Sequence, residues 1–182
     1  MEKTSSNTLN QLLTKRYSPR SFSDQPVETS TLHKILDAAR LAPSSFNEQP
    51  WRFIYATKAQ PEEYLRLLSC LNEKNQRWAD EAPVLIVGIA KKTFTAIEKL
   101  NRHAWYDTGA AVGFMTLKAT EENIYMHQMA GFMPQKAVEL LHIPEEYEPV
   151  VMIALGYRGE AERPDKGRKP LEEIAFRGEW KA

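Results

Sequence analysis

Paired cysteines and long apolar segments are both missing from this sequence of 182 residues. Cys70 is the single cysteine, so no intramolecular disulfide can form, which suits a reducing compartment. No run approaches the roughly 18 consecutive apolar residues that are typical of a membrane-spanning helix. Residues 1–10 are polar and lack the apolar segment of a secretory signal. We therefore expect a soluble, cytoplasmic protein with no membrane partner.

A net charge of either sign is also missing, since 24 lysines and arginines balance 24 aspartates and glutamates. A broad basic surface for nucleic acid is therefore not expected, and any local basic cluster would serve something small. The composition, with 42% hydrophobic and 26% charged residues, is ordinary for a globular protein. The length fits one domain, and we expect residues 1–182 to form it.

Several well-known chemical motifs do not occur in the sequence. There is no GxGxxG after a strand, no Walker motif and no GxSxG. None of His33, His103, His127 and His142 belongs to an HExxH or CxxC/HxxxH pattern, so we expect no metal site. Cys70 falls in an apolar helical segment, where a core thiol is more common than a nucleophile.

The spacing of apolar residues and prolines predicts helices that alternate with a few short strands. Residues 72–80 are expected to form a short helix or a loop, and residues 125–133 a loop. The predicted class is α+β, a small central sheet with helices around it. Predicted helices cover residues 8–16, 29–42, 61–70, 101–123 and 134–142, and predicted strands cover residues 51–56, 84–90 and 149–156.

Three segments carry further information. The run 84–90 is continuously apolar, as in a strand buried on both faces. The long predicted helix contains Gly109 and Gly113, and each glycine costs a helix about 1 kcal/mol relative to alanine. We expect another backbone to approach closely there. The tail, residues 157–182, has little core of its own and is expected to be an arm that packs on something else.

Two basic clusters lie at opposite ends of the chain, each beside a proline. The first, residues 15–21, places Arg16 and Arg20 at a predicted helix exit. Arginine offers a rigid fork of donors that matches phosphate oxygens, and serine adds a hydroxyl. The second is residues 166–170. Each cluster alone would be an ordinary solvated turn, but two repelling clusters would be placed together only around an anion.

The sequence RYSPRSF at residues 16–22 resembles the opening motif of the FMN-dependent nitroreductase family. At the family's spacing, APSSFNEQPWRF at residues 42–53 resembles its second motif. These two motifs together are fairly specific, and the resemblance extends in order over nearly the whole chain. Residues 82–87, 107–111, 131–134 and 166–171 resemble its central strand, the start of its dimer helix, the loop near the flavin ring and its C-terminal phosphate clamp.

The resemblance implies an α+β fold with a central, mainly antiparallel sheet surrounded by helices. It also implies an intertwined homodimer that exchanges its C-terminal arms, about residues 157–182. The implied cofactor is FMN, with NADH or NADPH as electron donor. The implied reaction is ping-pong hydride transfer to a small acceptor such as a nitroaromatic or a quinone. The flavin carries this chemistry, so no catalytic protein residue is expected.

By the same resemblance, the two basic clusters hold the FMN phosphate and ribityl chain or reach the polar edge of the ring. A positive group near that edge would stabilise the anionic reduced flavin, and Arg20 is the candidate. The residues concerned are Arg16, Tyr17 (through its backbone), Ser18, Arg20, Lys166 and Arg168.

The resemblance assigns the flavin ring to segments from both subunits. Residues of the second motif are expected to come from the partner and to lie against the ring. Asn75 is matched to an asparagine of the family that contacts the ring, and the loop after residue 128 would supply backbone groups near the flavin N5 edge. The residues concerned are Pro43, Ser44, Ser45 and Asn47 of the partner, and Asn75, Met129, Ala130 and Gly131.

The chain departs from the family's pattern in a few places. Met133 stands where an acidic residue is common, and Gln128 and Ala130 replace a proline and a glycine. The segments 51–80 and 91–101, which often cover the substrate, are short. A specialised reductase or dehalogenase with a narrow substrate therefore remains open. A non-catalytic flavin- or nucleotide-binding protein and an interaction module with solvated basic loops also remain open.

Overall fold

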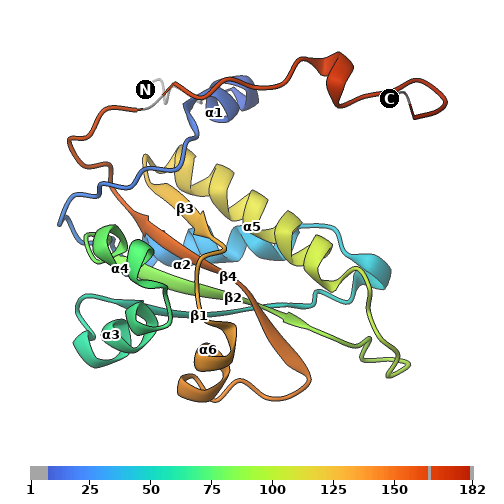
Figure 1. Cartoon of the computed structure of the whole chain (residues 1–182), viewed down its shortest axis with the longest axis horizontal. Coiled ribbons are helices and arrows are strands. Elements are labelled where there is room, and N and C mark those ends of the chain that lie inside the picture. Colours follow the sequence, from blue (N-terminus) through green and yellow to red (C-terminus); the bar gives the residue numbers. More distant parts are fainter. Residues whose placement is uncertain (1–7, 164, 181–182) are drawn as a thin grey trace, which may run out of the picture.

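A four-stranded sheet forms the centre of the structure, a computed structural model that describes residues 8–163 and 165–180. Its strands lie in the order β1-β2-β4-β3, and each neighbouring pair is antiparallel (Figure 1). The α+β class and the antiparallel sheet implied by the sequence are therefore confirmed. In chain order the strands are β1 (Trp51–Thr57), β2 (Val84–Lys91), β3 (Tyr125–Met129) and β4 (Tyr147–Gly156).

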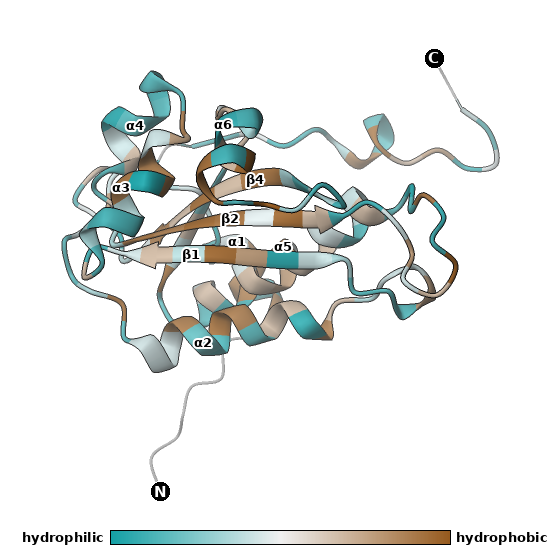
Figure 2. Ribbon diagram, turned by 90° about the horizontal axis from the view of Figure 1, so that it is seen from below, coloured by the Kyte–Doolittle hydropathy of each residue, from teal (hydrophilic) through white to brown (hydrophobic). Residues whose placement is uncertain are grey.

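Helices cover both faces of this sheet. α2 and α5 pack on one face, and α3, α4 and α6 pack on the other (Figure 2). Within the described residues, no helix is both long and apolar enough to cross a membrane. The helices are α1 (Leu9–Lys15), α2 (Thr29–Ala38), α3 (Pro61–Ser69), α4 (Glu73–Ala79), α5 (Ala104–Glu121) and α6 (Pro134–Leu140), with short 3₁₀ turns at Ala39–Leu41, Ser45–Asn47 and Leu171–Glu173.

Strand β2 contributes to both hydrophobic cores, because successive side chains of a strand point to opposite faces. Val84 and Ile86 belong to the cluster beneath α2 and α5. Leu85, Val87 and Ile89 belong to the cluster beneath α3, α4 and α6. This double burial confirms the prediction drawn from the uninterrupted apolar run.

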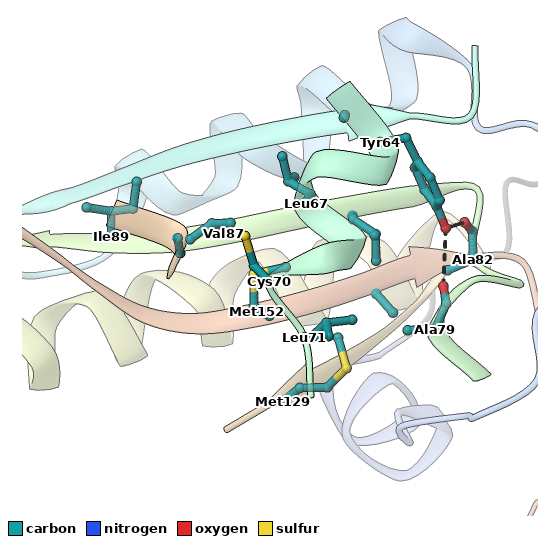
Figure 3. Packing of buried hydrophobic residues seen from close by; sticks show 14 of the residues in the cluster. Tyr64, Leu67, Cys70, Leu71, Ala79, Ala82, Val87, Ile89, Met129 and Met152 are labelled. Carbon is teal, nitrogen blue, oxygen red and sulfur yellow. Dashed lines mark hydrogen bonds between the residues drawn. The ribbon is translucent and has the colours of Figure 1, made fainter. Parts of the chain in front are cut away.

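The cluster beneath α3 fixes the segment that leads into β2. The buried Tyr64 hydroxyl donates to the Ala82 carbonyl at 2.6 Å and lies 3.2 Å from the Ala79 carbonyl (Figure 3). Cys70 lies in the same cluster, where burial raises the pKa of its thiol. The expectation that Cys70 is a core residue is therefore confirmed.

The prediction of a loop over residues 125–133 was wrong for its first half. Strand β3 pairs with β4, with Met126 opposite Leu155 and Gln128 opposite Ile153. Its sequence, YMHQM, contains two polar residues and no β-branched residue, so local propensity did not indicate a strand. The pairing partner decides the conformation of this segment. Residues 130–133 form the remaining connection to α6.

The start of one strand differs from the expectation, and the structure decides between the two alternatives left open for residues 72–80. Strand β4 begins at Tyr147, before Pro149, and its pairing with β2 shifts register between Gly88 and Ile89. A proline lacks the N–H that a regular ladder needs, and an irregularity in the register tolerates it. Residues 72–80 contain a helix, α4, because the Asn72 side chain caps its first turn by accepting from the Asn75 N–H.

The expected close approach to the glycines of α5 is not made within the described chain. A Cβ added to Gly109 or Gly113 would meet no atom within 4 Å. On the same helix, Trp105, Tyr106 and Phe114 are 53, 79 and 41% exposed. These five residues, called the open α5 face below, leave much apolar surface uncovered by residues 8–163 and 165–180.

Candidate functional site

Backbone pairing brings the two basic clusters together. The Ser23 N–H donates to the Tyr157 carbonyl, and the Gly159 N–H donates to the Ser21 carbonyl, both at 3.1 Å. A Cβ on Gly159 would collide with Ser21, so glycine permits this approach. The start of the C-terminal arm consequently runs beside residues 21–23 and leads residues 161–163 and 165–168 past the N-terminal cluster (Figure 1).

The paired segments enclose a polar hollow of about 420 Å³, called the basic cavity below. A second hollow of about 460 Å³ continues from it and shares Tyr17, Ser18 and Lys166 as lining residues. Pro19, Arg20 and Ser21 line the continuation. Lining the basic cavity are Arg16, Tyr17, Ser18, Arg163, Asp165, Lys166 and Arg168.

Positive charge dominates the basic cavity. Partial burial lowers the pKa of the Arg16 guanidinium, and the nearby positive charges of Arg168 and Arg163 lower it further. Among the described residues, no carboxylate lies within 4.0 Å of the charged groups of Arg16, Lys166 or Arg168, although Asp165 also lines the cavity. Repelling cations without carboxylate partners make this cavity suited to a phosphate.

Tyr17 and Arg163 form the wall of the basic cavity. The Arg163 guanidinium lies 5.3 Å from the centre of the Tyr17 ring and donates to the Thr14 carbonyl at 2.8 Å. The rings of Tyr17 and of Tyr125 in β3 pack in an edge-to-face arrangement, at 5.0 Å between ring centres. Arg163 belongs to none of the motifs found in the sequence. The only signal for it was a basic residue in the charged tail, three positions before Lys166.

The loop at residues 43–49 has a strained but well-supported backbone. Phe46, Asn47 and Gln49 have positive φ angles of 53, 55 and 51°, which are uncommon for residues other than glycine. The buried Asp107 carboxylate accepts from the Ser45 N–H at 2.9 Å. Ser44 supports the other end of the loop, where its Oγ accepts from the Gln49 N–H at 3.0 Å.

The structure does not bring this loop to the basic cavity of the same chain. Asp107 holds the loop at the N-terminal end of α5, whereas Lys15, the first residue of the first basic cluster, donates to Asn123 beyond the C-terminal end of α5. The helical stretch from Asp107 to Glu121 alone, at about 1.5 Å per residue, places roughly 21 Å between these contacts. Pro43, Ser44 and Ser45 line a separate hollow of about 280 Å³ with three residues of the α5 region.

The loop at residues 129–131 is held by α4. The Asn75 side chain donates from Nδ2 to the Gly131 carbonyl at 2.9 Å, and the Asn72 N–H donates to the same carbonyl at 3.1 Å. A Cβ on Gly131 would lie 2.5 and 2.6 Å from the amide nitrogens of Asn72 and Asn75, so a larger residue there would displace these two side chains. Met129 is buried at the end of β3.

The fold and the site define an α+β protein with an antiparallel four-stranded sheet and a positively charged cavity between its N-terminal segment and its C-terminal arm. Comparison with known proteins gives the family. The family model described as "Nitroreductase family" matches residues 13–157, and the chain belongs to this family. The resemblance found in the sequence is therefore confirmed.

Relatives with curated names support the same assignment. The chain is 27% identical to the "NADH dehydrogenase" of Thermus thermophilus, with 89% of this chain and 92% of that protein covered. It is 27% identical to the "FMN reductase [NAD(P)H]" of Bacillus subtilis, with 89% of this chain and 70% of that protein covered.

Solved structures share the whole fold. A crystal structure described as "the oxidoreductase containing FMN" has a TM-score of 0.87 and 32% identity, and covers 100% of this chain and 96% of its own. A nitroreductase family protein from Clostridium difficile 630 has a TM-score of 0.80 and 29% identity, with 95% of this chain and 99% of that chain covered.

Proposed function

We propose that this protein is an FMN-dependent NAD(P)H oxidoreductase that reduces small electrophilic acceptors such as nitroaromatics or quinones. One observation carries the proposal: four cationic side chains converge on one cavity with no carboxylate ion pair among the described residues. Relatives named as an FMN reductase and as an oxidoreductase containing FMN support it. When bound, FMN would accept a hydride from NADH or NADPH and pass it to the acceptor in a second half-reaction.

The residues of the basic cavity fit the phosphate of FMN. The guanidiniums of Arg16 and Arg168 and the ammonium of Lys166 would neutralise the phosphate and relieve their mutual repulsion. Ser18, whose hydroxyl lies 3.5 Å from Arg16, offers a short donor beside them. Arg20 lines the continuation of the cavity, where a positive charge would stabilise the reduced, anionic ring.

A second subunit would complete the site in this proposal. The open α5 face is apolar and contains two glycines, so it can accept a closely packed partner. The C-terminal arm also exposes Leu171, Ile174 and Trp180 at 66, 64 and 81%, and these residues would pack on the other chain. In such a homodimer with exchanged arms, the loop at residues 43–47 would wall the flavin of the partner.

A spectroscopic experiment tests the proposed function. The purified protein, or the apoprotein after addition of FMN, is expected to show bound-flavin absorbance that NADH or NADPH bleaches under anaerobic conditions. A panel of nitroaromatics, quinones and enones should then restore the colour and define the acceptor range. A protein that takes up no FMN would contradict the proposal. Bound FMN that neither donor bleaches would indicate a flavin-binding protein without turnover. The cytoplasmic location stays a prediction from the single cysteine.

A further inference from the structure

His127 of β3 lies outside both hollows and holds the N-terminal segment at residues 16–20, which is expected to contact the cofactor. Its Nδ1 atom lies 2.7 Å from the Pro19 carbonyl oxygen, although 108 residues separate the two in sequence. A carbonyl oxygen only accepts hydrogen bonds, so Nδ1 carries the proton and donates. The hydrogen bond fixes the orientation of the peptide group that joins Pro19 to Arg20.

Trp78 of α4 lies between His127 and the loop at residues 129–131, the second segment that is expected to contact the cofactor. Its ring centre is 4.5 Å from that of His127, with 42° between the ring planes. The Arg20 guanidinium lies 5.9 Å from the centre of the same indole ring. The indole N–H donates to Oδ1 of Asn75 at 3.3 Å, and Asn75 in turn donates to the Gly131 carbonyl.

These contacts form one continuous path between two segments that are far apart in the sequence. It runs from the segment at residues 16–20, through His127, Trp78 and Asn75, to the loop at residues 129–131. Both segments are expected to touch FMN, one at its phosphate and ribityl chain and the other at its ring. The path therefore sets their separation before the cofactor arrives, which lowers the cost of binding.

We propose that His127 is a positioning residue for FMN, which acts through the Pro19 carbonyl and, with Trp78 and Asn75, fixes the spacing of the two cofactor segments. The inference rests on the proposed function. It also gives Asn75 a second role, since its amide oxygen and one amide hydrogen are already bonded within the protein.

Histidine suits this position because its imidazole can donate a hydrogen bond while it is neutral. Burial lowers the pKa of the His127 imidazole, and the positive charges of Arg20 and Lys166 lower it further, while the carbonyls of Pro19 and Ser18 act in the opposite direction. A neutral imidazole donor adds nothing to the repulsion among the nearby cations. A lysine or arginine at the same place would add to it.

Two substitutions of His127 separate the contribution of its hydrogen bond to FMN affinity from the contribution of the packing of its ring. His127→Asn keeps an N–H donor near the position of Nδ1, whereas His127→Leu keeps an apolar side chain and has no donor. His33→Asn is the matched control, because His33 lies on α2 and contacts Tyr55 instead of either hollow. FMN affinity would be measured by fluorescence titration of each apoprotein, and thermal unfolding of the apoproteins would report folding.

His127→Leu is expected to weaken FMN binding by roughly 3- to 10-fold, the range of one neutral hydrogen bond. His127→Asn should recover most of this loss, and His33→Asn should bind like the original protein. Wild-type affinity in His127→Leu, or equal losses in both His127 variants that fold normally, would overturn the inference and leave the proposed function intact. Failure of the original protein to bind FMN would instead overturn the proposed function.

A second measurement determines directly which ring nitrogen of His127 carries the proton. Nitrogen NMR of the protein labelled at histidine should show Nδ1 of His127 protonated and Nε2 unprotonated at pH 7.5. The opposite tautomer would remove the donor from the Pro19 contact and overturn the inference, whatever the effect of the substitutions.

Discussion

The Asp107 carboxylate accepts a hydrogen bond from the backbone N–H of Ser45 at 2.9 Å, across 62 residues of sequence. Asp107 is only 4% exposed, so this contact anchors the positive-φ loop at residues 43–49 to the first turn of α5. Backbone strain of this kind persists only where the surroundings enforce it. The loop is therefore held in one shape, as a wall for a partner's flavin would require.

Asp107→Ala would leave the Ser45 N–H without this acceptor. We expect the free energy of unfolding to fall by about 1–3 kcal/mol, the cost of an unpaired polar group in a poorly solvated place. Urea unfolding of the FMN-free protein measures it. Asp37→Ala is the control, because the side chain of Asp37 is 59% exposed and, within residues 8–163 and 165–180, its ion pair is with Arg40 on the surface. Its expected cost is below about 1 kcal/mol. Equal losses in the two variants would contradict the anchoring role.

Arg16→Ala should change the FMN-free and the FMN-bound protein differently. Removal of a guanidinium that Arg168 and Arg163 repel should leave the melting temperature of the apoprotein unchanged or raise it. FMN affinity should fall by about 2–5 kcal/mol, as for a desolvated charge pair. Arg66→Ala, an exposed arginine of α3, should change neither quantity. Unchanged FMN affinity in Arg16→Ala would refute its assignment to the phosphate.

Most of the fold could be predicted because the pattern of each segment agrees with its final environment. The apolar run of β2 is buried on both faces, as expected. β3 could not be predicted from its own residues, since Tyr125 to Met129 become a strand only through hydrogen bonds with β4. The irregular pairing opposite Pro149 is likewise a property of two strands together.

The site also contains residues that the sequence could predict and residues that it could not. The basic clusters around Arg16 and Lys166 could be recognised because charged donors beside prolines form a local pattern. Arg163 and His127 could not, since their importance comes from contacts with the Thr14 and Pro19 carbonyls, far away in the sequence. Such contacts carry no local signal.

Arg163 joins the C-terminal arm to the N-terminal helix, and its removal should loosen the arm. Its guanidinium binds the Thr14 carbonyl and lies against the Tyr17 ring. In Arg163→Ala, we expect limited proteolysis to cut the arm faster and FMN affinity to fall by about 3- to 10-fold, because the second basic cluster is less well held. Arg163→Lys keeps the charge but not the planar fork. If Arg163→Lys fully recovered both the protease resistance of the arm and the FMN affinity, the charge alone would hold the arm and the planar fork would not be needed.

His127 should make the stability of the apoprotein depend on pH. Its folded-state pKa lies below the ordinary value of 6.5, so the unfolded chain binds a proton more readily. This contribution to stability is fully present above about pH 6.5 and is lost as the pH falls from there toward the folded-state pKa. Urea unfolding at pH 7.5 and 5.5 should therefore show a smaller acid loss in His127→Asn than in the original protein. The same acid loss in both proteins would contradict this assignment.

The open α5 face allows the proposed homodimer to be tested without touching the basic cavity. A Cβ placed on Gly109 would meet no described atom within 4 Å, so the single chain tolerates a larger side chain there. Gly109→Ala should gain helix stability, by up to about 1 kcal/mol, and keep the dimer. Gly109→Trp should fold equally well as a chain, yet force the partner helix away.

Sedimentation of the original protein and of Gly109→Ala should give about twice the chain mass of 20.9 kDa. Gly109→Trp should shift toward the single chain mass and lose FMN affinity, although every residue of the basic cavity is unchanged. Loss of cofactor by a substitution roughly a helix length away follows only if the partner's loop at residues 43–47 completes the ring site. A monomeric original protein that binds FMN tightly would contradict the shared site, because the residues of one chain would then be sufficient.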